Sequence, residues 1–184
     1  MRVVSGTAKG VRLVPVPRGV RPVSDMAREG LFSSIAADLP RARVLDLYAG
    51  TGALGIEALS RGAEFATFVE RNPAAHCAIA RNLERTHLSD LARIVRVDVL
   101  AFLGGDDRRG APFDLAFADP PYDEPGERVG AAIERLASGW LARHGWTVVL
   151  TRGTKSSMPV IPVDWRIARR LEYGDTLVLV CREV

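Results

Sequence analysis

The stretch VLDLYAGTGALG, from Val44 to Gly55, decides the fold. An apolar run with the composition of a buried strand leads into a G-x-G-x-x-G array formed by Gly50, Gly52 and Gly55, and a helical stretch follows. Such an array lets the backbone turn tightly between the first strand and the first helix of a Rossmann-like sheet, close to a nucleotide-like ligand. The glycines alone do not distinguish one such ligand from another.

The rest of the chain repeats this alternation of apolar runs and helical stretches. We predict strands over residues 43–48, 65–70, 93–98, 113–118 and 146–151, and helices over residues 53–61, 73–85, 99–103 and 126–138. Asn72 is expected to cap the second of these helices, with Pro73 at its first position. Alternation of this kind is typical of a parallel sheet with helices on both faces. Near the C-terminus, WRIARRLEY and TLVLVC are joined through Gly174 and Asp175, a link that suits a tight hairpin turn. The pattern predicts an α/β fold with a mostly parallel, seven-stranded sheet and an antiparallel last strand.

The first forty residues precede this alternation and carry an excess of basic side chains. Residues 1–20 contain RVVSGTAKGVRLVPVP, which predicts a small basic β-hairpin outside the main sheet. Residues 21–40 predict a leading helix capped by Ser24 or Asp25, and residues 41–184 form the core of the same single domain. Clustered basic residues are candidate contacts for a polyanion, and here they are Lys9, Arg12, Arg18, Arg21 and Arg28.

The composition is that of a soluble globular protein. The 184 residues are 47% hydrophobic and 26% charged, with a formal net charge of +3. No apolar run approaches the roughly 18 residues that a membrane span needs, and the N-terminus lacks a signal peptide's apolar core, so we expect a cytoplasmic protein. The cysteines, Cys77 and Cys181, and the histidines, His76, His87 and His144, are scattered, which predicts no disulfide and no metal site. We expect a monomer.

Acidic residues end three successive predicted strands, where open α/β sheets bind their ligands: Asp46, Glu70 and Asp98. In an NAD site Asp46 would face the pyrophosphate, and like charges about 4 Å apart cost roughly 4 kcal/mol at an effective dielectric constant of about 20. S-adenosylmethionine carries an ammonium and a sulfonium group and no phosphate, so Asp46 suits it. Glu70 is expected to accept the two ribose hydroxyls, and Asp98 the adenine amino group. An NAD-dependent oxidoreductase remains an alternative, because the glycine array and Glu70 occur in such enzymes as well.

The stretch FADPPYD, from Phe117 to Asp123, follows the fourth predicted strand. Its prolines end the strand and turn the backbone rigidly. If the Asp119 carboxylate and the Pro120 carbonyl accept the two N–H bonds of an exocyclic amino group, the nitrogen lone pair leaves conjugation with the ring and faces the donor. Tyr122 offers a face for base stacking, a contact of about 1–3 kcal/mol. The predicted catalytic residues are Asp119, Pro120, Pro121 and Tyr122, and the predicted cofactor-binding residues are Asp46, Gly50, Thr51, Gly52, Glu70, Arg71, Asp98, Val99 and Asp119.

These motifs resemble those of the class I amino-methyltransferases, which carry Asp or Asn, Pro, Pro and an aromatic residue. Over nearly its whole length the chain is similar to the bacterial 16S ribosomal RNA guanine-N2 methyltransferase family, whose order of motifs it shares: RVVSGTAKGVRL, RPVSDMAREGLF, VLDLYAGTGALGIEALSRGA, FVERN, DPPY and YGDT. The resemblance implies a Rossmann-like class I methyltransferase fold and S-adenosylmethionine-dependent methylation of a guanine N2 atom. It also implies that the N-terminal hairpin grips 16S rRNA and that the assembled small ribosomal subunit is the substrate.

The DPPY motif does not select one base, because guanine, adenine and cytosine all carry an exocyclic amino group. An adenine-N6 methyltransferase acting on DNA or RNA is therefore the nearest alternative, although a DNA enzyme of this kind normally needs a further target-recognition domain. A non-catalytic RNA-binding module is a third possibility, since it would share the basic N-terminal segment.

Overall fold

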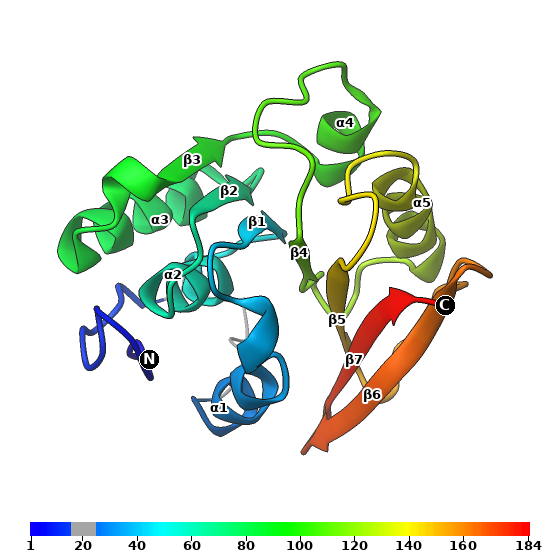
Figure 1. Cartoon of the computed structure of the whole chain (residues 1–184), viewed down its shortest axis with the longest axis horizontal. Coiled ribbons are helices and arrows are strands. Elements are labelled where there is room, and N and C mark those ends of the chain that lie inside the picture. Colours follow the sequence, from blue (N-terminus) through cyan, green and yellow to red (C-terminus); the bar gives the residue numbers. More distant parts are fainter. Residues whose placement is uncertain (16–24) are drawn as a thin grey trace.

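Seven strands form one mixed sheet in the order β3-β2-β1-β4-β5-β7-β6 (Figure 1), within the residues that the computed structural model describes, 1–15 and 25–184. The strands are β1 (Arg43–Leu47), β2 (Phe65–Val69), β3 (Ala92–Val95), β4 (Leu115–Ala118), β5 (Thr147–Gly153), β6 (Trp165–Tyr173) and β7 (Thr176–Glu183). All neighbouring pairs are parallel except those of β7, which runs antiparallel to both β5 and β6. The predicted α/β fold with its antiparallel last strand is confirmed.

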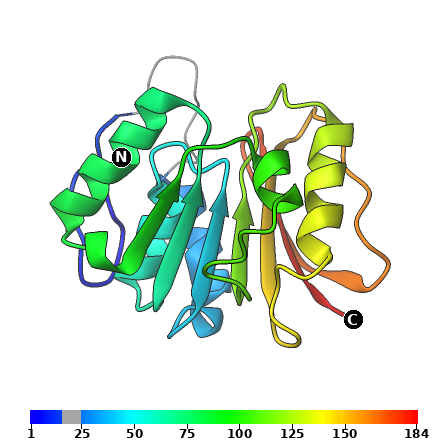
Figure 2. The same ribbon diagram turned by 90° about the horizontal axis from the view of Figure 1, so that it is seen from above.

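Helices cover both faces of this sheet (Figure 2). They are α1 (Asp25–Ser34), α2 (Ala53–Ser60), α3 (Pro73–Thr86), α4 (Val99–Gly104) and α5 (Gly126–Ala137), with short 3-10 helices η1 (Ala36–Asp38) and η2 (Ser89–Leu91). One apolar core contains side chains of α1, α2 and α3, and a second core, on the other face, contains those of α4 and α5. Within the described ranges, none of the helices combines the length and the apolar composition that crossing a membrane requires.

The start of α3 depends on two adjacent residues, as the sequence predicts. Oδ1 of Asn72 accepts hydrogen bonds from the backbone N–H groups of Ala74, at 2.9 Å, and Ala75, at 3.2 Å. Pro73 occupies the first helical position, where its missing N–H costs no hydrogen bond. This cap fixes the short connection between α3 and the carboxyl end of β2. Of the two caps predicted for α1, Ser24 lies outside the described residues, and the helix begins at Asp25.

The predicted N-terminal β-hairpin is not formed as a pair of strands in the residues that the structure describes. One antiparallel bridge joins Arg2 to Arg12, and the backbone N–H of Val3 donates to the carbonyl of Val11 at 3.0 Å, but residues 1–15 form no strand. The predicted hairpin continued to residue 20, but residues 16–24 lie outside the described ranges. The segment also packs against the helices through buried apolar side chains, namely Val3, Ala8 and Leu13. Gly6, at φ +84°, passes so close to the Ser60 carbonyl that a Cβ atom there would overlap it.

Buried polar side chains of the scaffold fix this segment in place. Glu57 of α2 is fully buried, and its carboxylate accepts a hydrogen bond from the backbone N–H of Val4 at 2.7 Å. Asn82 of α3 accepts from the backbone N–H of Val14 at 2.7 Å and donates to the carbonyl of Thr51 at 2.9 Å. The N-terminal segment is therefore joined, through one amide side chain, to the loop that follows β1.

Candidate active site

A cavity of about 470 Å³ opens at the carboxyl ends of β1, β2 and β4. The parallel register places Leu47 of β1 beside Val69 of β2 and Ala118 of β4, so residues that follow these strands meet at one edge. The cavity is lined by almost all of the predicted cofactor-binding and catalytic residues: Asp46, Gly50, Thr51, Glu70, Arg71, Asp98, Val99, Asp119, Pro120, Pro121 and Tyr122. Gly52 does not line it and packs instead towards Phe68, Ile56 and Ile79.

Asp46 lies at the end of β1 with a buried carboxylate, 1% exposed. Its Oδ2 accepts a hydrogen bond from the backbone N–H of Gly55 at 2.9 Å. Burial raises the pKa of Asp46 well above its usual value, and the negative charges of Asp119 and Glu70 raise it further. A carboxylate held under these conditions favours a cationic ligand, because a nearby positive charge stabilises its ionised form.

The glycines of the G-x-G-x-x-G array have separate structural roles. Gly50 and Gly52 adopt positive φ angles of +56° and +78°, a conformation that side chains disfavour. Gly55 packs so closely on Phe68 that a Cβ atom there would overlap the ring. The N–H group of Gly55 donates to the carboxylate of Asp46. The array therefore both shapes the turn and holds the buried carboxylate.

Glu70 follows β2 and stabilises the glycine loop. Its Oε2 accepts from the backbone N–H of Gly50 at 2.8 Å, and its Oε1 accepts from that of Asn72 at 2.7 Å. A carboxylate has about four lone-pair sites, so Glu70 keeps acceptor capacity for a pair of hydroxyl groups. The glutamate is therefore positioned by the backbone on both sides while it faces the cavity.

Asp98 lies at the start of α4 and not at the end of a strand, because β3 ends at Val95. Its Oδ1 caps the helix by accepting from Leu100 N–H at 2.9 Å. Its Oδ2 pairs with Arg71 at 3.4 Å and with Arg128 at 2.9 Å. The capping and the ion pairs fix the carboxylate at the cavity wall.

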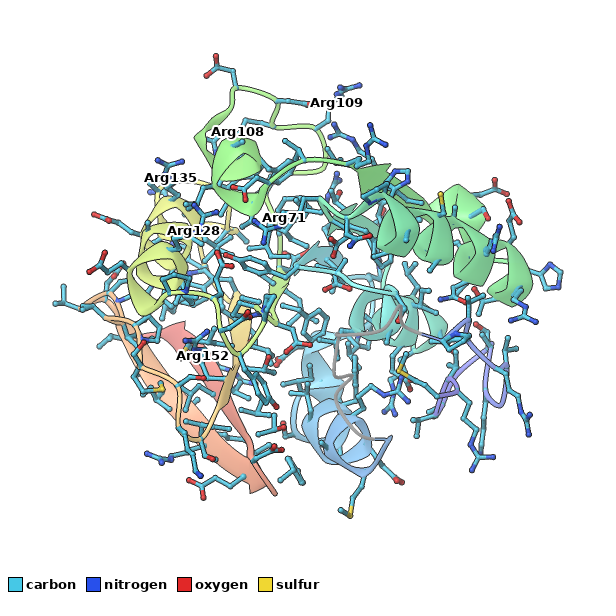
Figure 3. The ribbon with its side chains drawn as sticks, turned by 180° about the vertical axis from the view of Figure 1, so that it is seen from behind. Arg71, Arg108, Arg109, Arg128, Arg135 and Arg152 are labelled. Carbon is cyan, nitrogen blue, oxygen red and sulfur yellow. The ribbon has the colours of Figure 1, made fainter. Side chains whose placement is uncertain are left out.

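Three arginines from different elements contact Glu124 (Figure 3): Arg71 after β2, Arg128 on α5 and Arg152 on β5. Of these three, only Arg71 lines the cavity. Arg128 pairs with Glu124 at 2.6 Å, and Arg152 donates to the Glu124 carbonyl at 3.2 Å. Arg152 is 1% exposed, and burial lowers its pKa. These contacts connect α5 and β5 to the chain that follows the DPPY motif. By contrast, Arg108 and Arg109 belong to the loop after α4, at the amino edge of the sheet.

Asp119 directly follows β4, and its carboxylate faces the cavity. The hydroxyl of Thr151 on β5 donates a hydrogen bond to its Oδ1. Burial raises the pKa of Asp119 to about 6, while the hydrogen bond from Thr151 opposes this shift. The carboxylate is therefore ionised above about pH 6 and remains an acceptor there.

Tyr122 is half-buried and lines the same cavity. Its hydroxyl lies 2.5 Å from Oγ1 of Thr176 on β7, and its carbonyl accepts from the hydroxyl of Ser156 at 3.0 Å. These two bonds fix both ends of the residue. The aromatic ring is thus held in place next to Asp119 before any base enters.

Tyr48 is a cavity residue that the sequence analysis missed. It lies between Asp46 and the glycine array at φ +58°, a left-handed conformation that is rare for an aromatic residue. Its buried hydroxyl has no hydrogen-bond partner among the described residues. Burial, together with the charges of Glu124 and Asp98, raises its pKa to about 12. The signal that could have identified Tyr48 is its position in the sequence, two residues before Gly50, at the turn that follows the first strand.

The predicted RNA-binding residues do not share one environment. Lys9 and Arg12 are exposed on the N-terminal segment, whereas Arg18 and Arg21 lie outside the described residues. Arg28 is fully buried, unlike Lys9 and Arg12, and its RNA contact stays a prediction. Its Nη2 donates to the carbonyl of Arg2 at 2.7 Å, and the side chain lines the cavity. Among the residues that the structure describes, no cluster of side chains is suited to holding a metal ion.

The strand order, with antiparallel β7 between β5 and β6, and the cavity at the carboxyl edge define an α/β class I methyltransferase fold. Comparison with known proteins then specifies the family. A family model described as conserved hypothetical protein 95 matches residues 1–182, and the chain belongs to this family.

Named relatives match nearly the whole chain. Ribosomal RNA small subunit methyltransferase D of Escherichia coli strain K12 is 34% identical over 179 residues, which cover 95% of this chain and 85% of the relative. The protein of the same name from Haemophilus influenzae is 30% identical over 178 residues, covering 95% and 89%. A solved structure of a hypothetical protein from Thermus thermophilus has a TM-score of 0.82 at 34% identity and covers 100% of this chain and 99% of that chain. The resemblance stated from the motifs is confirmed at the level of the family.

Proposed function

We propose that this protein transfers a methyl group from S-adenosylmethionine to the exocyclic N2 amino group of a guanine in 16S rRNA of the small ribosomal subunit. It acts as a single cytoplasmic domain formed by residues 1–184. The observation that carries the proposal is the position of Asp119, Pro120 and Tyr122 on the wall of a cavity that also contains the buried Asp46 carboxylate. The names of the E. coli and H. influenzae relatives support a ribosomal RNA substrate.

The residues of the cavity match the charged and polar groups of the proposed methyl donor. Asp46 would stabilise its cationic amino acid moiety, since a buried carboxylate with a raised pKa gains most from a positive partner. Glu70 has acceptor capacity for the ribose hydroxyls, and Asp98 for the adenine amino group. Thr51, Arg71 and Val99 complete the wall. When bound, S-adenosylmethionine supplies an electrophilic methyl group on a positively charged sulfur.

The acceptor side of the cavity orients the guanine amino group. The base stacks on Tyr122, and Asp119 and the Pro120 carbonyl accept one N–H bond each. Both bonds draw the nitrogen out of conjugation and direct its lone pair towards the donor side of the cavity. The rigid Pro120–Pro121 pair keeps the carbonyl aimed at the same point. Asp119 performs this role best when it is ionised, because a protonated carboxyl keeps only part of its acceptor capacity.

The N-terminal segment is proposed to hold the RNA near this cavity. Lys9 and Arg12 are exposed on it, and Met1 and Arg28 bring the segment and α1 to the cavity wall. Contacts from Lys and Arg to phosphates supply affinity that depends on salt but carry no base specificity. An unpaired or extruded guanine is the form that fits a pocket of this kind.

Two measurements test the proposal. Calorimetry with S-adenosylmethionine and, separately, with NAD tests the cofactor, and tight binding of NAD alone would contradict the account. Transfer of a labelled methyl group to small subunits from a strain that lacks the enzyme tests the reaction. We expect label in 16S rRNA with the wild-type protein and none with Asp119→Ala. No label with the wild-type protein would favour a non-catalytic RNA-binding module.

A further inference from the structure

We infer that the YGDT turn between β6 and β7, Tyr173 to Thr176, positions the aromatic ring on which the substrate base stacks. The inference rests on the proposed function, because it concerns how Tyr122 presents its face to the base. Thr176 contacts Tyr122 and does not line the cavity, so it is a positioning residue. Motif analysis singled out this turn, but neither the donor site nor the DPPY motif explains it.

Two residues that are paired across neighbouring strands, Gly153 and Thr176, contact the side chain of Tyr122. The antiparallel pairing of β5 and β7 places Gly153 opposite Thr176. Oγ1 of Thr176 is 2.5 Å from the Tyr122 hydroxyl, and the threonine is 8% exposed. A Cβ atom on Gly153 would lie 3.2 Å from both Cγ and Cδ2 of Tyr122, so the ring rests on the bare backbone of β5.

The backbone of Tyr122 is held from the same place. Ser156, three residues after Gly153, donates from its hydroxyl to the Tyr122 carbonyl at 3.0 Å, and its own N–H donates to the Gly153 carbonyl at 2.9 Å. Three residues near the end of β5 and the start of β7 thus contact Tyr122: Gly153 contacts its ring, Thr176 its hydroxyl and Ser156 its carbonyl. The orientation of its ring is therefore fixed from the sheet.

The other end of the turn contacts α1. A Cβ atom on Gly30 would overlap the Tyr173 hydroxyl, so helix and tyrosine meet at a glycine. Two residues before Gly30, Arg28 lines the cavity and donates to the carbonyl of Arg2. At one end of the turn Thr176 contacts the Tyr122 hydroxyl, and at the other end Tyr173 contacts α1, the helix that carries Arg28.

The hydrogen bond between Tyr122 and Thr176 matters for the reaction because alignment decides the rate. A tyrosine ring without a fixed hydroxyl can tilt about its side-chain torsions, and a base stacked on it tilts as well. Misplacement of about 1 Å can cost about a hundredfold in rate. If this hydrogen bond only stabilised the fold, its removal would lower the stability of the protein and leave the alignment of the base unchanged.

The test compares substitutions at both ends of the bond, using the full-length protein and small ribosomal subunits. Thr176→Val keeps the shape and removes the hydroxyl, and Tyr122→Phe removes its partner. We expect each to lower kcat/KM for subunits about tenfold, the loss associated with one hydrogen bond, while the Kd for S-adenosylmethionine changes less than about twofold. The double variant should lose about tenfold and not about a hundredfold, because both changes remove the same bond.

Two further variants separate positioning from stability. Thr176→Ser keeps the hydroxyl and should have an activity within about threefold of the wild type. The remaining difference would reflect the packing contacts of the one methyl group that the substitution removes. Thr147→Val is the matched control, since Thr147 is buried at the other end of β5 and its hydroxyl donates to Asp38 at 3.2 Å. It should lower the unfolding temperature without changing the rate.

The inference is wrong if Thr176→Val is as active as the wild type, or if the double variant shows the product of the two single losses. Both outcomes require an active wild-type protein. A wild-type protein that transfers no methyl group to subunits would instead contradict the proposed function, so the two failures are distinguishable.

Discussion

The hydroxyl of Thr151 donates a hydrogen bond to the carboxylate of Asp119. The parallel register of β4 and β5 produces this contact, because it pairs Ala118 with Leu150, the residues that directly precede the two partners. The proposed catalytic carboxylate is thus oriented by a neighbouring strand of the sheet. The contribution of this contact to the reaction can be tested by conservative substitutions at either residue.

Substitution of Asp119 tests the role of its carboxylate as an acceptor. Asp119→Ala should lower kcat by at least about a hundredfold, the loss typical of a preorganised electrostatic partner, and change donor affinity only a few fold. Asp119→Asn should retain part of the activity, since an amide oxygen also accepts a hydrogen bond. Single-turnover rates and calorimetry measure the two effects. Loss of donor binding in Asp119→Ala would place the residue in the donor site instead.

The pH dependence of kcat should reflect the pKa of Asp119, which burial raises to about 6. Because the ionised form is the stronger acceptor, the rate should fall as pH decreases through about 6. The hydrogen bond from Thr151 favours the ionised form, so Thr151→Val should move the midpoint of this profile to higher pH. A midpoint that stays in place would show that another group controls the profile.

Asp46→Asn should separate stability from donor binding. The folded protein raises the pKa of Asp46, so the ionised carboxylate destabilises the ligand-free fold increasingly as pH rises above the ordinary value of about 4. The amide removes this cost and can still accept from Gly55. We expect a higher unfolding temperature than the wild type at pH 8, a smaller difference at pH 5, and donor affinity at least about tenfold weaker. Equal donor affinity would contradict the proposed role of Asp46.

The N-terminal segment should be tested by point substitutions. Its deletion would remove Val3, Ala8 and Leu13 from the apolar core and confuse RNA affinity with stability. Lys9→Ala combined with Arg12→Ala should raise KM for subunits, leave kcat unchanged and reduce the salt dependence of binding by about one unit of slope for each lost phosphate contact. Arg109→Ala, at the amino edge of the sheet, is the control. An unchanged KM and salt slope in the double variant would refute the RNA contact.

The sequence predicted the elements whose signals are local. The glycine array, the Asn72–Pro73 helix start and the Gly174–Asp175 hairpin each fix the backbone within a few residues, and all three were confirmed. The burial of Arg28 could not be predicted, because a count of basic residues carries no information about burial. The N-terminal hairpin was predicted as two strands, but its two arms share only one antiparallel bridge and a few backbone hydrogen bonds, because other backbone N–H groups of the segment donate to scaffold side chains such as Glu57.

Contacts between residues that are far apart in the chain could not be predicted from the sequence. Tyr122 and Thr176 are separated by 54 residues, and the register of β5 with β7 decides that they meet. The same holds for Thr151 and Asp119, which are separated by 32 residues. Residue types at strand ends were enough to predict which side chains share the cavity, but the partners that orient them required the structure.

The identity of the methylated atom tests the central claim most directly. Small subunits from a strain lacking the enzyme are treated with the wild-type protein and labelled donor, and the 16S rRNA is digested and analysed by mass spectrometry. The account predicts a single labelled nucleoside, a guanosine with one methyl group on N2. A label on the N6 atom of adenosine, or unlabelled 16S rRNA, would contradict it.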